Sequence, residues 1–87
     1  MQYVYILRCN NNLTYVGCTH DLKERFQRHC NGHVPSTKPH RPVTLLFYCA
    51  FPDKGIAFRF EKYLKSGSGR AFMNKRLLER SSIFSPT

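Results

Sequence analysis

Two short tyrosine triplets near the amino terminus carry the side chains of this sequence that are best suited to chemistry. They are Tyr3-Val4-Tyr5 and Tyr15-Val16-Gly17, and Tyr5 precedes Tyr15 by ten residues. The 87-residue chain has fourteen lysines and arginines against five acids, which gives a formal net charge of +9. Phenols held beside so much positive charge suggest a phosphate-ester site, because a basic surface attracts polyanions.

Two strands and a tight turn must position these tyrosines. Residues 3 to 9 and residues 13 to 19 are rich in Tyr, Val, Ile, Leu and Thr, which favour strands. Between them lies Asn10-Asn11-Asn12, and asparagine tolerates the left-handed backbone that tight turns need. We therefore expect a β-hairpin.

The length of the turn decides whether the two phenols face the same way. A three-residue loop places Tyr5 opposite Gly17, and Tyr5, Tyr15 and Gly17 then share one face of the hairpin. An even-numbered loop would put the tyrosines on opposite faces. We predict the three-residue register.

The middle of the chain predicts one helix, a loop and a third strand. A helix from Asp21 to about Asn31 has Asp21 as its N-cap and an apolar stripe of Leu22, Phe26 and Cys30. Residues 32 to 42 contain three prolines and favour an exposed loop. Residues 43 to 51 are almost wholly apolar, which predicts a strand buried on both faces at the centre of the sheet.

The last third of the chain predicts two helices. The first begins at Pro52-Asp53 and ends at Ser66-Gly67, and Ser68 caps a shorter one that runs to about Leu78. A chain of this length holds one domain, which we place at residues 1–80, with a flexible tail at residues 81–87.

Three further side chains could complete a site with the tyrosines. Arg25 and His29 are one helical turn apart and suit phosphate binding and proton exchange; the alternative is two solvated residues on a basic helix. Glu61 is the acid with the least obvious structural role, and its carboxylate could hold Mg²⁺ against a phosphate. The alternative for Glu61 is an ordinary ion pair with Lys65.

Other basic residues are candidates for contacts with a nucleic-acid backbone. The segment Ser66 to Arg70 either binds an anion through its free amides or merely connects two helices. Contacts of this kind position nucleic acid without reading its sequence. The candidates are Lys38, Arg41, Lys62, Lys65, Arg70, Lys75 and Arg76.

The four cysteines include no CxxC pair, and the first residues lack a secretory signal, which predicts a reducing, cytoplasmic setting. His29, Cys30 and His33 could bind zinc, but buried thiols and surface imidazoles are the simpler interpretation. The sequence contains no stretch long and apolar enough to span a bilayer.

Together these residues resemble the GIY-YIG nuclease superfamily, whose two name-giving triplets correspond to Tyr3-Val4-Tyr5 and Tyr15-Val16-Gly17. Arg25, His29 and the segment Phe58 to Glu61 extend the resemblance, which covers residues 3 to about 78. The pattern is similar to compact bacterial members related to the excinuclease C amino-terminal domain. It is also similar to the catalytic domain of eukaryotic structure-specific endonucleases, without their zinc-binding module.

The resemblance implies a fold and a set of roles. The fold would be a small α/β (α+β) domain, a three-stranded antiparallel sheet flanked by about three helices in the order β-β-α-β-α-α. Tyr5 would be the general base, and Arg25 would stabilise charge on the phosphate. The remaining implied site residues are Tyr15, Gly17, His29, Glu61 as the ligand of one divalent ion, Mg²⁺ or Mn²⁺, and, less securely placed, Asn74.

We therefore expect a metal-dependent DNA endonuclease that acts on structured or branched DNA in repair or recombination, with RNA as an alternative substrate. A partner protein could present the substrate. The competing interpretation is an inactive adaptor that keeps the fold and binds nucleic acid. Because an unperturbed phenol has a pKa of about 10, a tyrosine base requires Arg25 and metal charge to favour the phenolate.

Overall fold

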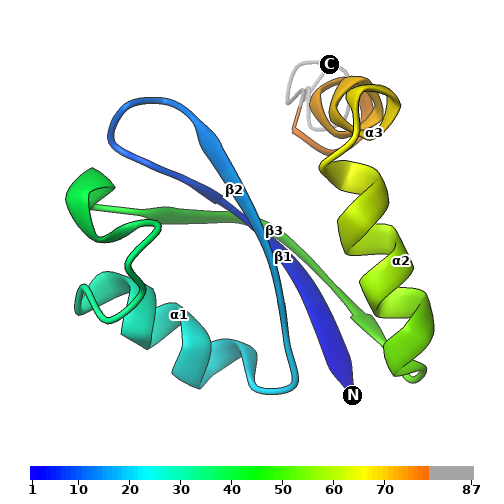
Figure 1. Cartoon of the computed structure of the whole chain (residues 1–87), viewed down its shortest axis with the longest axis horizontal. Coiled ribbons are helices and arrows are strands. Elements are labelled where there is room, and N and C mark those ends of the chain that lie inside the picture. The colour runs from blue at the N-terminus through cyan, green and yellow to red at the C-terminus, as the bar shows by residue number, and fades with distance from the viewer. Residues whose placement is uncertain (79–87) are drawn as a thin grey trace, which may run out of the picture.

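A three-stranded antiparallel sheet separates the helices into two layers. The computed structural model describes residues 1–78, and its strands β1 (Gln2–Arg8), β2 (Thr14–Thr19) and β3 (Thr44–Phe51) are arranged in the order β2-β1-β3. Helix α1 (Leu22–Cys30) lies on one side, and α2 (Lys54–Leu64) and α3 (Gly67–Phe72) lie on the other (Figure 1). The predicted fold and element order are confirmed.

The hairpin has the predicted three-residue register. The Cys9 amide donates to the Leu13 carbonyl at 2.9 Å, and Asn12 takes the left-handed backbone with φ 68°. Tyr5 pairs with Gly17 as a consequence. Since alternate residues of a strand point to opposite faces, Tyr5, Tyr15 and Gly17 share the face that α1 covers.

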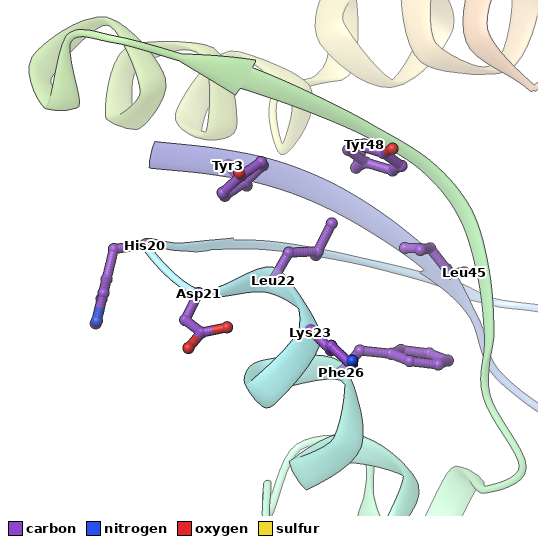
Figure 2. A pocket seen from close by; sticks show the side chains of 8 residues that line it. All are labelled: Tyr3, His20, Asp21, Leu22, Lys23, Phe26, Leu45 and Tyr48. Carbon is purple, nitrogen blue, oxygen red and sulfur yellow. The ribbon is translucent and has the colours of Figure 1, made fainter. Parts of the chain in front are cut away.

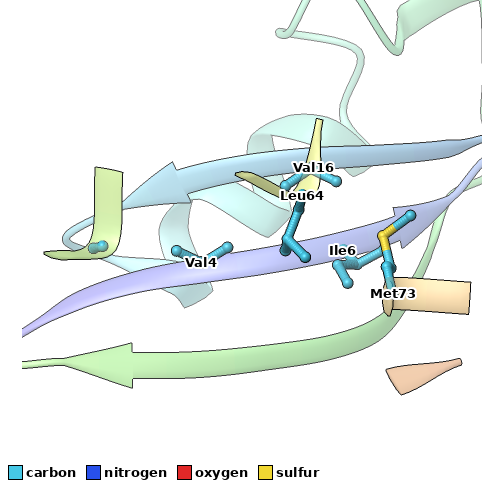
Figure 3. Close-up of a cluster of buried hydrophobic side chains, with 6 residues drawn as sticks. Val4, Ile6, Val16, Leu64 and Met73 are labelled. Carbon is cyan, nitrogen blue, oxygen red and sulfur yellow. The ribbon is translucent and has the colours of Figure 1, made fainter. Parts of the chain in front are cut away.

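Each face of the sheet has its own apolar cluster. The face under α1 buries residues around Tyr5 and Leu7, with Leu22 and Phe26 of α1 packed against them. On the opposite face, α2 and the turn that follows α3 pack onto β1 and β2 (Figure 3). The buried members of that cluster are Val4, Ile6, Val16, Ala57, Leu64 and Met73.

The prediction that residues 43 to 51 form the central strand is wrong. β1 is central, and four consecutive residues of it are buried, whereas β3 lies at an edge and has no fully buried residue. An apolar run indicates the burial of side chains on average but not which neighbours pair with the backbone. β1 is central because it pairs with both β2 and β3.

The loop after α1 is more ordered than its prolines suggest. It contains a short 3-10 helix at Lys38–His40, and Val34 and Thr37 are buried within it. The prediction of a wholly exposed loop is therefore wrong at these two positions. Gly32, at φ +77°, ends α1 as predicted, because a left-handed residue cannot continue a helix.

The cap of α3 also differs from the prediction. Asp21 and Asp53 cap α1 and α2 as expected, but the hydroxyl of Ser66, not Ser68, accepts from the Gly69 amide. A turn of π-helix at Met73–Leu77 extends α3.

Within residues 1–78, no helix is both long enough and apolar enough to cross a membrane. The tail predicted at residues 81–87 lies outside the described range.

Gly69 allows α3 to approach α2, which suggests a stability test. A Cβ atom at Gly69 would lie 1.6 Å from the Tyr63 carbonyl oxygen, whereas one at Gly67 would meet nothing within 4 Å. We expect Gly69→Ala to lower the free energy of unfolding by about 3 kcal/mol or more, since backbone must move. Gly67→Ala, the matched control, should be neutral or stabilising by up to about 1 kcal/mol. Urea unfolding measures the free energy of unfolding of both variants. Equal effects would show that helix propensity, not the close approach of α3 to α2, determines the effect of each substitution.

Candidate active site

The phenol of Tyr5 lies directly over Gly17 on the neighbouring strand. A Cβ atom at Gly17 would come within 2.3 Å of the Tyr5 hydroxyl oxygen, so no larger residue fits there without moving the ring. Tyr5 is fully buried, and its hydroxyl lies over the backbone of Gly17. The missing side chain of Gly17 thus creates the space that the phenol occupies.

His29 of α1 holds the Tyr5 hydroxyl. The phenolic oxygen lies 2.8 Å from His29 Nε2, and His29 Nδ1 lies 2.8 Å from Thr37 Oγ1. Both His29 and Thr37 are buried. His29 is therefore the second member of a buried chain of hydrogen bonds, and the alternative of a solvated residue is wrong for it.

The direction of this chain follows from its last member. The Thr37 hydroxyl donates to the Val34 carbonyl at 3.5 Å, so its oxygen accepts from His29 Nδ1–H. His29 Nε2 then carries a lone pair and accepts from the Tyr5 hydroxyl. Thr37 fixes the tautomer of His29 that can accept a proton from Tyr5.

The charge state of both groups is set mainly by burial. Burial lowers the pKa of His29 to about 4, and the positive charges of Arg25 and Arg28 lower it further. Burial raises the pKa of Tyr5 to about 12, although Arg25 acts in the opposite direction. A tyrosine base requires a lowered phenol pKa. In the protein alone burial outweighs Arg25, and both Tyr5 and His29 are neutral at pH 7.

Arg25 and Glu61 approach Tyr5 from opposite faces of the sheet. The polar contact with Tyr5 raises the pKa of Arg25, and among residues 1–78 its buried Nε has no hydrogen-bond partner. The Glu61 carboxylate is close enough to contribute to the raised pKa of Tyr5. The guanidinium carries a permanent charge and further N–H donors, which suit the oxygens of a phosphate.

Glu61 also forms the ion pair that was the alternative to metal binding. Its carboxylate accepts from Lys65 Nζ at 3.1 Å, and the glutamate side chain is only 22 % exposed. The described part of the chain contains no group of three His, Cys, Asp or Glu residues placed to share a metal. His29, the centre of the possible zinc site, has both ring nitrogens engaged with Tyr5 and Thr37.

The other predicted residues differ in how close they lie to this site. The Tyr15 ring centroid is 5.1 Å from that of His29 and 6.3 Å from that of Tyr5, so Tyr15 belongs to the site. Asn74 is exposed in the π-helical turn, and no described contact joins it to these residues. Lys65 and Arg70 line a hollow of about 250 Å³ with Tyr15. The remaining basic candidates, Lys38, Arg41, Lys62, Lys75 and Arg76, are exposed and do not line that hollow.

A larger hollow, of about 480 Å³, lies away from these residues. It is formed by the start of α1 together with β1 and β3, where the rings of Tyr3 and Tyr48 stand beside Leu22 and Phe26 (Figure 2). Neither Tyr5 nor Arg25 nor Glu61 lines it. Size alone would therefore have pointed to the wrong part of the surface.

Comparison with known proteins identifies the family: the profile of the GIY-YIG catalytic domain matches residues 1–76. The chain therefore belongs to the GIY-YIG family. Its fold is that of a nuclease domain.

Several curated relatives carry the name UPF0213 protein. One from Clostridium perfringens is 38 % identical over 66 residues, which cover 75 % of this chain and 71 % of that protein. One from Vibrio campbellii is 36 % identical over 63 residues, 71 % of this chain and 61 % of that protein. The chain thus spans less than two thirds of some relatives it matches. The solution structure of a Bacillus halodurans UPF0213 protein is similar over 100 % of both chains, with a TM-score of 0.59 and 31 % identity.

Thr37 is the site residue that sequence reasoning missed, and its role can be tested. Thr37→Val leaves the buried Nδ1–H of His29 without an acceptor, so we expect the free energy of unfolding to fall by about 1–3 kcal/mol. Nitrogen NMR of the histidine ring at pH 7 should show a single Nδ1–H tautomer in the parent and a mixture in the variant. Thr44→Val, at an exposed strand position, is the control. An unchanged tautomer would refute the role of Thr37.

The low pKa of His29 also predicts acid sensitivity. As the pH falls below 6.5, the ordinary histidine pKa, His29 of the unfolded chain binds a proton, whereas His29 of the folded protein binds one only near pH 4. The free energy of unfolding therefore decreases as the pH falls from about 6.5 to about 4. Between pH 7 and 5 the loss from His29 alone should be about 2 kcal/mol. Urea unfolding at both pH values measures it, and His29→Gln should lose that part of the dependence. An equal pH dependence in His29→Gln would contradict the assignment.

Proposed function

We propose that this protein is a divalent-metal-dependent DNA endonuclease that hydrolyses phosphodiester bonds. The observation that supports the proposal is the placement of Tyr5, which lies over Gly17, contacts His29 and has Arg25 and the charge of Glu61 near enough to shift its pKa. Family membership supports the class of activity. Tyr5, Arg25 and Glu61 would provide a proton-accepting oxygen, a charge for the phosphate and a carboxylate for a cation.

Tyr5 would act as a relay, not as a free phenolate. With pKa values of about 12 and about 4, transfer of the Tyr5 proton to His29 in the resting protein is uphill by on the order of 10 kcal/mol. We infer that the phenolic oxygen accepts a proton from the attacking water while its own proton passes to His29 Nε2. A phosphate bound at Arg25 offsets the positive charge that depresses the pKa of His29, which makes this transfer easier.

Glu61 is the residue that would hold the metal. A single carboxylate fits Mg²⁺ or Mn²⁺, since such an ion takes its remaining oxygens from water and phosphate instead of an all-protein cage. When bound, the ion supplies a Lewis acid for the phosphoryl oxygen. Lys65 is the present partner of Glu61, and its ammonium would then be free to contact a neighbouring phosphate.

Structured or branched DNA is the proposed substrate, in repair or recombination. The proposed active unit is residues 1–80, working in the cytoplasm, with a partner protein to present the DNA. Tyr15 would orient the phosphate or water at the mouth of the site. Asn74 and the exposed cations Lys38, Arg41, Lys62, Lys75 and Arg76 stay candidates for contacts farther along the DNA.

Cleavage assays on matched variants test the proposal. With supercoiled plasmid and branched DNA in Mg²⁺ or Mn²⁺, we expect Tyr5→Phe to lower the cleavage rate by roughly 100-fold or more, because the proton relay is lost. Glu61→Gln should remove metal-dependent cleavage. The control is Tyr3→Phe, which alters a phenol on the same strand.

The outcomes separate nuclease from adaptor. Cleavage by the parent that Tyr5→Phe leaves intact would refute the role of Tyr5. DNA binding without metal-dependent cleavage in the parent would favour the adaptor, which one observation already supports: in the protein alone Tyr5 is neutral and Glu61 is paired with Lys65.

A further inference from the structure

One face of α2 carries a line of four side chains that the active site uses only in part. Lys54, Phe58, Glu61 and Lys65 are spaced by four, three and four residues, which puts them on one stripe of a helix. Two contacts confirm the alignment: Lys54 Nζ lies 5.7 Å from the centre of the Phe58 ring, and Lys65 pairs with Glu61. The stripe lies beside the face that buries Ala57 and Leu64.

This stripe lies beside β2 and runs in the opposite direction. Lys54 and Phe58 line a hollow of about 390 Å³ together with Cys18 and Thr19, at the end of the strand. Lys65 lines the smaller hollow beside Thr14 and Tyr15, at the beginning of the strand. We call these the Lys54 hollow and the Lys65 hollow.

Helix α1 provides the other wall at the Lys54 hollow. Arg25 and Arg28 line that hollow opposite Lys54, and Glu24 is the one acid among its lining residues. Glu24 is 3.9 Å from Arg28, a loose and exposed pair that restrains the arginine little. The Lys54 hollow therefore has a clear excess of positive charge.

The edge of β2 is thus basic at both ends and holds the reactive side chains in the middle. Lys54 and Arg28 stand at one end, Lys65 and Arg70 at the other, and Tyr5 lies over Gly17 between them. The six residues of β2 extend roughly 20 Å at 3.3 Å each. A strand in duplex geometry places about six nucleotides along such a length, so phosphates on both sides of the central one fall beside cations.

Phe58 adds an aromatic surface to one end of this path. Its side chain is 46 % exposed within the Lys54 hollow, beside Lys54 and facing Arg28 across the hollow. An exposed ring among cations suits an unpaired base, because any base can stack on it while the cations contact the backbone. A base that is paired within a duplex cannot stack in this way.

We propose that a DNA strand lies along the outer edge of β2 and that its unpaired portion enters the Lys54 hollow, where a base stacks on Phe58 and phosphates contact Arg28 and Lys54. The inference deepens the proposed nuclease function and rests on it. It assigns to the substrate a junction between paired and single-stranded DNA. Lys65 and Arg70 hold the strand on the other side of the reactive phosphate.

Binding measurements with matched charge changes test the path. Fluorescence anisotropy with the full chain in EDTA, which prevents cleavage, gives the affinity for a single-stranded oligonucleotide, a duplex and a duplex with a single-stranded flap. The test variant is Arg28→Ala with Lys54→Ala. The control is Lys23→Ala with Arg59→Ala, which also removes one lysine and one arginine from α1 and α2 but outside both hollows.

We expect the test pair to weaken binding of the flap DNA about tenfold or more at moderate salt and to reduce the salt slope by roughly 1.4. The control pair should weaken it less than about threefold. Phe58→Ala should weaken flap and single-stranded binding roughly fivefold or more with little effect on the duplex. Tyr48→Ala is its control, at an exposed ring in the hollow of Figure 2.

Equal losses from the two charge pairs, or a larger loss from Tyr48→Ala than from Phe58→Ala, would overturn the path. This failure can be told from failure of the nuclease function itself. If the parent never cleaves DNA but the test pair loses binding, the path stands and the catalytic proposal falls. If the parent cleaves and both charge pairs behave alike, cleavage stands and the path falls. Thermal unfolding of all four variants, the two charge pairs and the two single aromatic substitutions, checks that their folding is unaltered.

Discussion

The close approach of the Tyr5 ring to the backbone of Gly17 is the contact on which the site depends. A side chain at position 17 would collide with the Tyr5 phenol. In the place that Gly17 leaves open, the phenol contacts both His29 and Arg25. The register of the hairpin puts the glycine opposite the tyrosine. The hairpin turn, Gly17 and the Tyr5 phenol therefore form one structural unit, and α1 and α2 pack on its two faces.

Local patterns were enough for much of this unit. Three asparagines between two β-rich segments define a loop whose length determines the register, and acidic N-caps mark where α1 and α2 begin. Such features depend on neighbouring residues, which the sequence displays directly. The triplets identified the family for the same reason, because their spacing reflects a fixed pairing of strands.

Features that depend on distant packing could not be predicted in this way. Nothing near Thr37 in a proline-rich loop indicates that its hydroxyl will meet His29, eight residues away. The apolar character of β3 does not reveal that β1 takes the centre of the sheet. Burial raises the pKa of Tyr5 and Arg25 lowers it. Which effect is larger depends on how deeply the ring is buried, and the sequence does not show this.

An unpaired strand edge usually invites a second molecule to extend the sheet. β2 has such an edge, and the cations Arg28, Lys54, Lys65 and Arg70 stand on both sides of it. Two copies that joined through β2 would bring these like charges together, which is unfavourable. The charges to which we assign DNA binding therefore also discourage self-association through β2, although no other strand within residues 1–78 covers its edge.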